Sequence, residues 1–171
     1  MTNSRTLVRN QEKTIHTLLN YDAILFDVDG TLLSFRTHRV PDSAVEALQR
    51  AHEKGVKLFI ASGRRKADID QAHLPDVFDG YVTLNGSRCF LSDGTVVFER
   101  FIDREDLETL VAWQQTSQAF PCALVTQEKL HLNFTDENVA LLGRQLNLEM
   151  PPADDLQEWI AVARSGVSQM L

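Results

Sequence analysis

Cysteine is scarce in this chain of 171 residues, which contains only Cys89 and Cys122. Neither thiol lies in a Cys-x-x-Cys or Cys/His pattern, so we expect no disulfide framework and no metal or redox role for them. Two isolated thiols fit the reducing cytoplasm, and we interpret both as small buried or half-buried side chains.

Long apolar runs are also missing from the sequence. No stretch approaches the roughly 20 apolar residues that a membrane-spanning helix needs. The first 20 residues contain no unbroken apolar stretch long enough for a secretion signal, and we interpret residues 1–20 as an N-terminal extension. The sequence therefore predicts a cytoplasmic protein without a membrane partner.

Positive charge is in deficit, with 17 Lys and Arg against 24 Asp and Glu and a net charge of -7. A negative surface argues against nucleic acid and anionic membrane as partners. If the substrate is also an anion, something local must offset the repulsion, and a divalent metal is the usual device. The 43% hydrophobic content is typical of a soluble globular protein, with one domain or one domain plus part of a second.

Strand and helix patterns alternate over the first half of the chain. Residues 21–27 read as a continuously apolar strand that is buried on both faces, and a helix follows from Pro41 to a cap at Gly55. A second buried strand (56–62), a short helix and a third strand (81–85) come next. This order predicts an α/β fold with a parallel sheet and right-handed crossovers.

The pattern changes at Asn85, where a hairpin over residues 87–101 turns at an Asp-Gly pair. Asp103 and Asp136 each precede a helical pattern, and two short apolar segments lie between those helices. Residues from about 86 onward therefore look like a separate α+β unit.

Two carboxylates, Asp27 and Asp29, stand at the end of the first strand. Residues i and i+2 of an extended chain point the same way, and ligands of a parallel sheet bind beyond the carboxyl ends of its strands. Gly30 allows a tight turn, and Thr31 adds a hydroxyl group. The pair is tolerable beside a divalent cation, and useful if one carboxylate is a nucleophile and the other a proton carrier. The alternative is an acidic turn that merely ends a strand.

The ends of the next two strands are also polar. Ser62, Gly63 and Arg64 bring a hydroxyl, backbone N–H groups and a cation to a predicted helix start, which favours a phosphate seat. Asn85 adds another donor. The alternatives are an N-cap with a solvated arginine and, for Asn85, a turn residue before glycine. Lys66 lends positive charge to the seat or lies on a solvated face.

The segments "FDVDGTLLSF", "FIASGR" and "YVTLNGSRCF", in this order and spacing, resemble the haloacid dehalogenase superfamily and, more narrowly, its Cof-type (class IIB) phosphatases. The resemblance implies a Rossmann-like parallel-sheet core over residues 21–86. It implies a partial class IIB α/β cap over residues 87–171.

The resemblance also implies roles for the site residues. Asp27 would attack phosphorus and form an aspartyl-phosphate, and Asp29 would protonate the leaving oxygen and then activate water. The Asp27 side chain and the Asp29 backbone carbonyl would hold Mg²⁺, and the substrate would be a small phosphorylated metabolite such as a sugar phosphate. The residues expected to bind phosphate or substrate are Val28, Gly30, Thr31, Ser62, Gly63, Arg64 and Asn85.

The family pattern continues with a lysine and a G-D-x-x-N-D segment that this sequence does not contain after Met150. Asp154 and Asp155 lack that glycine-rich context, and we interpret both as helix-capping residues. The chain thus resembles a truncated and incomplete family member. Three functions remain open: a Mg²⁺-dependent phosphohydrolase, an inactive remnant that at most binds Mg²⁺ or phosphate, and a phosphomutase.

The first strand has a further consequence under this resemblance. In the family, later strands pair with its free side, so here residues 23–29 would form an apolar edge strand. Such an edge invites pairing with another chain. We therefore expect a homo-oligomer, as a homodimer or a domain-swapped pair.

Overall fold

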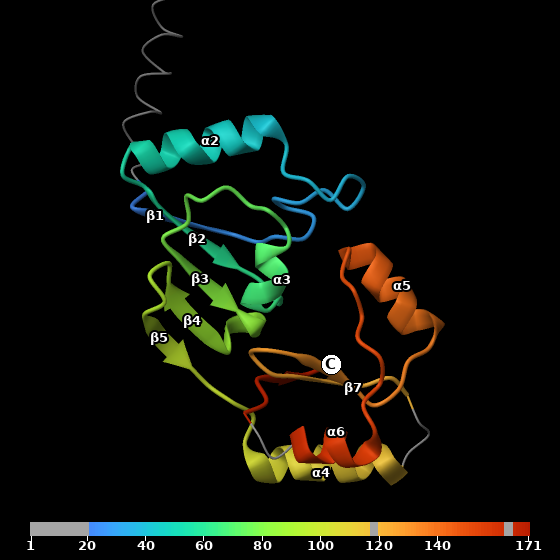
Figure 1. Cartoon of the computed structure of the whole chain (residues 1–171). Coiled ribbons are helices and arrows are strands. Elements are labelled where there is room, and N and C mark those ends of the chain that lie inside the picture. Colours follow the sequence, from blue (N-terminus) through green and yellow to red (C-terminus); the bar gives the residue numbers. More distant parts are fainter. Residues whose placement is uncertain (1–20, 117–119, 163–165) are drawn as a thin grey trace, which may run out of the picture.

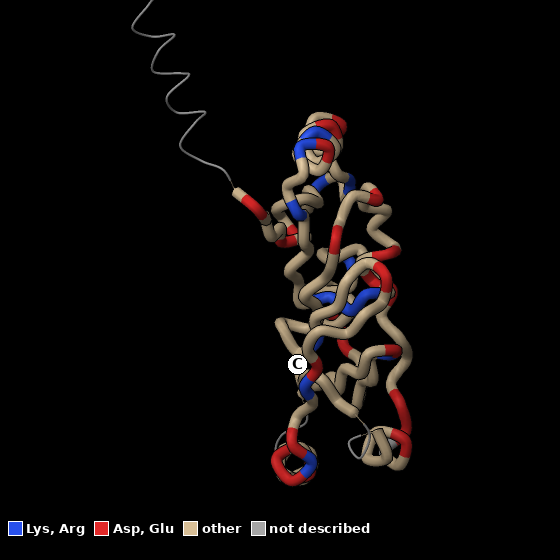
Figure 2. The backbone as a smooth tube through the Cα atoms, turned by 90° about the vertical axis from the view of Figure 1, so that its left-hand side faces the viewer, with Lys and Arg blue, Asp and Glu red and all other residues tan. Residues whose placement is uncertain are grey.

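The computed structural model describes residues 21–116, 120–162 and 166–171. The predicted N-terminal extension, residues 1–20, lies outside the described residues. Two sheets and their helices are stacked one after the other along the molecule (Figure 1). Lys and Arg positions are interspersed with Asp and Glu positions along the chain (Figure 2). No helix in the described part of the chain has the length and apolar character needed to cross a membrane.

The first sheet has five strands in the order in which they occur in the chain. β1 pairs with β2 and β2 with β3 in parallel, whereas β4 and β5 are antiparallel additions. This arrangement confirms the predicted α/β, Rossmann-like fold. The strands are β1 (Ala23–Phe26), β2 (Lys57–Ala61), β3 (Gly80–Thr83), β4 (Arg88–Leu91) and β5 (Val96–Glu99).

The two crossover helices are α2 (Asp42–Glu53) and α3 (Lys66–Asp70). α2 begins after Pro41, as predicted, because the fixed φ of proline suits a helix start. The helix is followed by Gly55 at φ +85°, a left-handed conformation that glycine adopts without strain.

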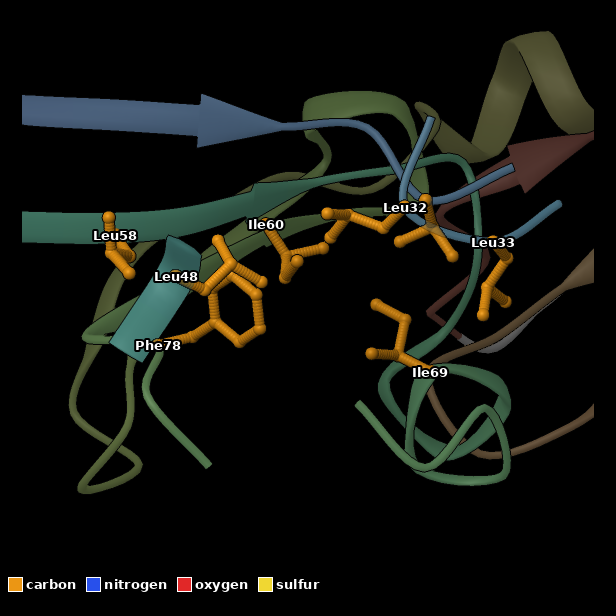
Figure 3. Packing of buried hydrophobic residues seen from close by; sticks show 8 residues of the cluster. Leu32, Leu33, Leu48, Leu58, Ile60, Ile69 and Phe78 are labelled. Carbon is orange, nitrogen blue, oxygen red and sulfur yellow. The ribbon is translucent and has the colours of Figure 1, made fainter. Parts of the chain in front are cut away.

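The core of the first unit lies between the sheet and these helices. Leu58 and Ile60 of β2 are fully buried, and Figure 3 shows Leu48 of α2 and Phe78 packed beside Ile60. Ile69 of α3 closes the other end of the same cluster, which fixes the two helices against the sheet. The cluster is completed by Val28, Leu32 and Leu33.

Among the described residues β1 is an edge strand, because it pairs there with β2 alone. The prediction that this strand is buried on both faces is wrong, since Leu25 is 59% exposed and Ile24 and Phe26 are only half-buried. A run of apolar residues predicts a strand with both faces covered, but in this structure one face of β1 remains open. The expectation of an apolar edge strand is confirmed.

The hairpin of β4 and β5 continues the first sheet. β4 pairs with β3 through the register from Gly80↔Leu91 to Thr83↔Arg88. The expectation that a separate unit begins at about residue 86 is therefore wrong for the hairpin. The short 3₁₀ turn η1 (Leu84–Gly86) reverses the chain so tightly that the next strand adds to the same sheet.

The second unit follows the hairpin and has a three-stranded antiparallel sheet in the order β7-β6-β8. Leu124 of β6 faces the helices, where Trp159 is buried, while Ala123 and Val125 face Leu84 of the first unit. Successive side chains of β6 thus pack into two different small cores, one on each face of the sheet. The elements are α4 (Arg104–Thr116), β6 (Ala123–Val125), β7 (Leu130–Leu132), α5 (Glu137–Leu146), α6 (Leu156–Val162) and β8 (Gln169–Met170).

Asp79 ties the entry of β3 to the start of β2. Its carboxylate accepts hydrogen bonds from Lys57 Nζ at 2.7 Å and from the backbone N–H of Leu58 at 3.0 Å. The hydrogen bond from Lys57 is the main cause of a lowered pKa for Asp79, to which the N–H of Leu58 also contributes.

We expect Asp79→Ala to lower the free energy of unfolding by about 1 kcal/mol near neutral pH. A lowered folded-state pKa contributes stability above the unfolded-state pKa of about 3.9, and this contribution disappears as pH falls through the folded-state pKa. The difference between wild type and variant in urea unfolding should therefore shrink in acid. Asp70→Asn, at the exposed ion pair with Lys66, is the control with little effect. A difference that is the same at pH 7 and at pH 3 would contradict this account.

Candidate active site

The loop after β1 folds back over a buried residue. Val28 is fully buried, and its carbonyl accepts hydrogen bonds from the backbone N–H groups of Leu32 at 3.1 Å and Leu33 at 2.8 Å. Gly30 has φ +76°, and its N–H donates to the Leu33 carbonyl at 2.8 Å. The tight turn predicted at Gly30 is confirmed, and it places Asp27 and Asp29 on either side of the Val28 anchor.

Asp27 lies directly beyond the last residue of β1 and is exposed. The Thr31 hydroxyl donates to Asp27 Oδ2 at 3.4 Å. An exposed carboxylate at the carboxyl end of a parallel strand is accessible to a solute. Asp27 therefore has the access that a nucleophile needs.

Asp29 has different surroundings from Asp27. Arg64 holds its carboxylate through two hydrogen bonds, from Nε to Oδ2 at 2.8 Å and from Nη2 to Oδ1 at 2.7 Å. The Asp29 side chain is 23% exposed, whereas that of Arg64 is only 7% exposed. This bidentate pair joins the end of β1 to the loop after β2.

Ser62 is buried at the end of β2, and its Oγ accepts a hydrogen bond from the backbone N–H of Arg64 at 3.2 Å. Ser62 is not an N-cap, because α3 begins after Arg65 and spans only five residues. The N-cap alternative for Ser62 is therefore wrong, and the phosphate seat stays a prediction. Among the described residues, no hydrogen bond joins Asp27 to Ser62.

The guanidinium of Arg64 is occupied by protein acceptors. Besides Asp29, it donates from Nη1 to the Asp68 carbonyl at 3.4 Å and from Nη2 to the Leu146 carbonyl at 2.6 Å. The solvated arginine considered as an alternative is wrong, since the side chain is buried. In this structure the N–H groups of the Arg64 guanidinium are directed at groups of the protein, and its expected contact with phosphate stays a prediction.

Gly63 and Asn85 lie against each other, with a bridging glutamine. Asn85 Nδ2 donates to Gln169 Oε1 at 2.7 Å, and Gln169 Nε2 donates to the Gly63 carbonyl at 3.3 Å. Asn85 has φ +54°, so it is also the turn residue that the alternative interpretation described. Gln169 was missed by sequence reasoning, because no local signal links β8 to a loop more than 100 residues away.

Three further polar residues have defined partners in the structure. Lys66 Nζ lies 4.7 Å from the centre of the Tyr81 ring and forms an ion pair with Asp70. Its charge is therefore used on the surface of α3. Asp155 caps α6 as predicted, through a hydrogen bond from the Glu158 backbone N–H at 2.9 Å. The capping interpretation of Asp154 is wrong, because its buried carboxylate contacts His131 Nδ1 at 2.5 Å. The spacing of His131 and Asp154 in the sequence does not indicate that they pair.

The oxygen donors after β1 are the groups that could hold a metal ion. The described residues contain no group of three or more His, Cys, Asp or Glu that could do so. Mg²⁺ commonly takes one or two protein oxygen ligands and completes its shell with water and substrate phosphate. The exposed Asp27 carboxylate and the Asp29 backbone carbonyl fit such a partial site, while Arg64 occupies the Asp29 carboxylate.

Comparison with a protein family agrees with this arrangement. The family model for haloacid dehalogenase-like hydrolases matches residues 24–155, which include most of β1, all of β2 and β3, and most of the second unit. The resemblance stated from the sequence motifs is thereby confirmed.

Curated relatives match part of the chain. An HMP-PP phosphatase of Cronobacter sakazakii is 34% identical over 88 residues, which is 51% of this chain and 30% of that protein. An HMP-PP phosphatase of Yersinia pestis is 31% identical over 97 residues, with 55% of this chain and 35% of that protein covered. The chain thus spans about a third of the length of the curated relatives it matches.

Solved structures match most of the chain. A subclass IIB sugar phosphatase is 34% identical with a TM-score of 0.74, over 87% of this chain and 57% of that chain. A phosphatase of the same superfamily from Bacteroides thetaiotaomicron is 32% identical with a TM-score of 0.72, over 88% of this chain and 55% of that chain. The shared fold includes both units described above.

The close approach of Gly63 to Asn85 can be tested. A Cβ atom at residue 63 would lie 2.9 Å from Asn85 Oδ1, so Gly63→Ala must displace the amide that bonds Gln169. We expect Gly63→Ala to lower the free energy of unfolding by about 1–3 kcal/mol. Urea unfolding measures this loss.

Asn85→Gly provides the matched control, because it removes the obstructing amide and glycine tolerates the positive φ. Adding Gly63→Ala to Asn85→Gly should therefore cost much less than adding it to wild type. Equal costs in the two backgrounds would show that the contact with Asn85 is not the cause.

Proposed function

The chain belongs to the haloacid dehalogenase-like hydrolases, and from this premise we propose that it is a phosphohydrolase of small phosphorylated metabolites that uses Asp27 as the nucleophile. The observation that carries the proposal is the exposed carboxylate of Asp27 at the carboxyl end of β1, beside a second carboxylate held by Arg64. The sugar phosphatase and the HMP-PP phosphatases to which the chain is similar point to the same class of substrate.

In the first step, an oxygen of Asp27 attacks phosphorus and the bond from phosphorus to the leaving oxygen breaks. The product of this step is an aspartyl-phosphate and the leaving alcohol, which takes its proton from Asp29. In the second step, water attacks phosphorus and gives a proton to Asp29, and the bond between phosphorus and the Asp27 oxygen breaks. Inorganic phosphate leaves, and both carboxyl groups return to their starting states.

In this proposal, phosphate is bound by polar groups that lie near the strand ends and keep hydrogen-bonding capacity for a ligand. The Thr31 hydroxyl lies beside the nucleophile, and the Ser62 hydroxyl and the Asn85 amide lie at the ends of the next two strands. Val28, Gly30 and Gly63 contribute by shaping the loops. Arg64 is left out of this set because its N–H groups are directed at protein acceptors.

Mg²⁺ is the cofactor that we propose for this site. The Asp27 carboxylate and the Asp29 backbone carbonyl would hold it, and when bound it supplies positive charge that offsets repulsion between the carboxylate nucleophile and the phosphate anion. The net charge of -7 makes such local compensation necessary for an anionic substrate.

The division of labour between the two units is also part of the proposal. We assign residues 21–86 with the added hairpin to the core, and the following α+β unit to a cap over the leaving group. We further propose that the protein acts in the cytoplasm, which two isolated thiols support.

Asp27→Asn is the direct test of the nucleophile. We expect this variant to lose hydrolysis of a sugar phosphate in the presence of Mg²⁺ by a factor of about 1000 or more, because an amide oxygen cannot form the aspartyl-phosphate. Removal of Mg²⁺ with a chelator should abolish wild-type turnover. Release of inorganic phosphate is the measurement.

Asp42→Asn, at the exposed start of α2, is the matched control for loss of one negative charge. Equal rates for wild type and Asp27→Asn would remove the assignment of Asp27. That result would support the alternative of a protein that binds phosphate or Mg²⁺ without turning over.

The exposed edge of β1 supports a proposal about assembly. Leu25 is 59% exposed in this edge strand, and Tyr21 and Phe35 nearby in the chain are 60% and 59% exposed. We propose that two copies associate along this edge, because unpaired backbone groups and apolar side chains are both buried by such pairing.

Leu25→Lys should prevent this association, since a charged side chain on an edge strand opposes pairing. Multi-angle light scattering at micromolar concentration should show the mass of a dimer for wild type and of a monomer for the variant. Leu141→Lys, at a comparably exposed leucine of α5, should leave the mass unchanged. A monomeric wild type would contradict the proposal.

A further inference from the structure

Arg64 links the candidate proton carrier to the second unit. We infer that Arg64 is a positioning residue, which fixes the carboxylate of Asp29 and couples its orientation to the seating of α5. The role given to Asp29 rests on the proposed function, whereas the coupling itself follows from the contacts described below.

The buried guanidinium needs all of its partners. Its side chain is only 7% exposed, and a buried charge that loses a partner is strongly destabilising. Nη2 donates both to Asp29 Oδ1 at 2.7 Å and to the Leu146 carbonyl at 2.6 Å, so the two acceptors share one nitrogen. A shift of the Asp29 carboxylate therefore moves the nitrogen that also bonds the Leu146 carbonyl, and the reverse holds as well.

Leu146 is a suitable anchor because it is the last residue of α5. The carbonyl groups of the last turn of a helix lack partners within the helix and carry its partial negative charge. Asn147 follows in the left-handed conformation and ends the helix there. The guanidinium thus satisfies a carbonyl at the end of α5 with a charge-assisted hydrogen bond.

The end of α5 is not packed tightly on the first unit at this point. A cavity of about 620 Å³ lies beside Arg64, with Val40 and Val45 on the side of the first unit and Leu146 and Asn147 on the side of α5. In Figure 1, α5 stands beside α3 across this region. The hydrogen bond from Arg64 therefore joins the two units at a place where their side chains leave space.

The ion pair leaves Asp29 able to meet a substrate. A carboxyl group has about four lone-pair positions on its two oxygens, and Arg64 takes one on each oxygen. In the proposed reaction, one of the free positions carries the proton that the leaving alcohol takes, and it later accepts the proton of the attacking water. Arg64 thus sets the direction of the carboxylate without using up its acceptor capacity.

Arg65 provides a matched control within the same loop. It also holds a carboxylate in a bidentate pair and donates to one carbonyl of the second unit, but its partners are Asp68 and Glu128. Loss of Arg65 removes the same kinds of contact without touching Asp29.

The first experiment compares two substrates that differ in their need for a proton. An alkyl phosphate such as a sugar phosphate needs the proton of Asp29 as the alcohol leaves, whereas 4-nitrophenyl phosphate releases a stable phenolate. We expect Arg64→Ala to lower kcat for the alkyl phosphate about 100-fold and for the aryl phosphate less than about tenfold, with KM nearly unchanged.

Arg65→Ala should affect both substrates equally. Arg64→Lys should not restore turnover of the alkyl phosphate, because lysine keeps the charge but cannot bond both oxygens of Asp29 and the Leu146 carbonyl in one plane. Equal losses on the two substrates for Arg64→Ala, or full rescue by lysine, would overturn the assignment.

The second experiment measures the coupling without any turnover. Amide hydrogen exchange of residues 143–150 should rise about fivefold in Arg64→Ala and also in Asp29→Asn, because Arg64 links Asp29 to the end of α5. Arg65→Ala should instead raise exchange over residues 126–130, where Glu128 lies. Unchanged exchange at residues 143–150 in Asp29→Asn would overturn the coupling.

The two experiments separate the two proposals. Absent hydrolysis by wild type, together with coupled exchange in Asp29→Asn, would remove the proposed function and leave the coupling established. Hydrolysis that depends on Asp27, together with uncoupled exchange, would keep the proposed function and remove the role of Arg64.

Discussion

The bidentate ion pair between Asp29 and Arg64 is the constraint on which the rest of the site depends. It joins the loop after β1 to the loop after β2, and the same guanidinium reaches the last carbonyl of α5. A buried arginine requires acceptors on every side, so these three segments must keep their relative positions. Arg64 thus contacts the candidate proton carrier, holds two loops of the first unit together and attaches the second unit.

Much of the contact between the two units is polar. Arg64 and Arg65 both donate to backbone carbonyls of the second unit, and Ser87 Oγ donates to the Ser168 carbonyl at 3.0 Å. Leu84 supplies the apolar part of the contact by packing against the small sheet. The hydrogen bond of the buried Arg64 fixes the end of α5 on the first unit, because a buried charge needs its acceptors.

The interpretation of individual residues succeeded where their chemistry is local. The turn at Gly30, the start of α2 after Pro41 and the cap at Asp155 follow from backbone conformations and short-range hydrogen bonds that neighbouring residues decide. It failed where partners come from distant segments. Asp154 was assigned to a cap because no residue near it in the sequence indicates His131, and no residue near Arg64 indicates Leu146 as its partner.

The sequence by itself determined the α/β class, the placement of two carboxylates beyond the first strand and the family to which the chain belongs. These features depend on hydrophobic periodicity and on motifs that span a few residues. Only the tertiary structure decided that the hairpin joins the first sheet, that β1 has an open face, and which groups meet Arg64 and Asn85. Such contacts depend on which segments come together in space, and a one-dimensional pattern does not record that.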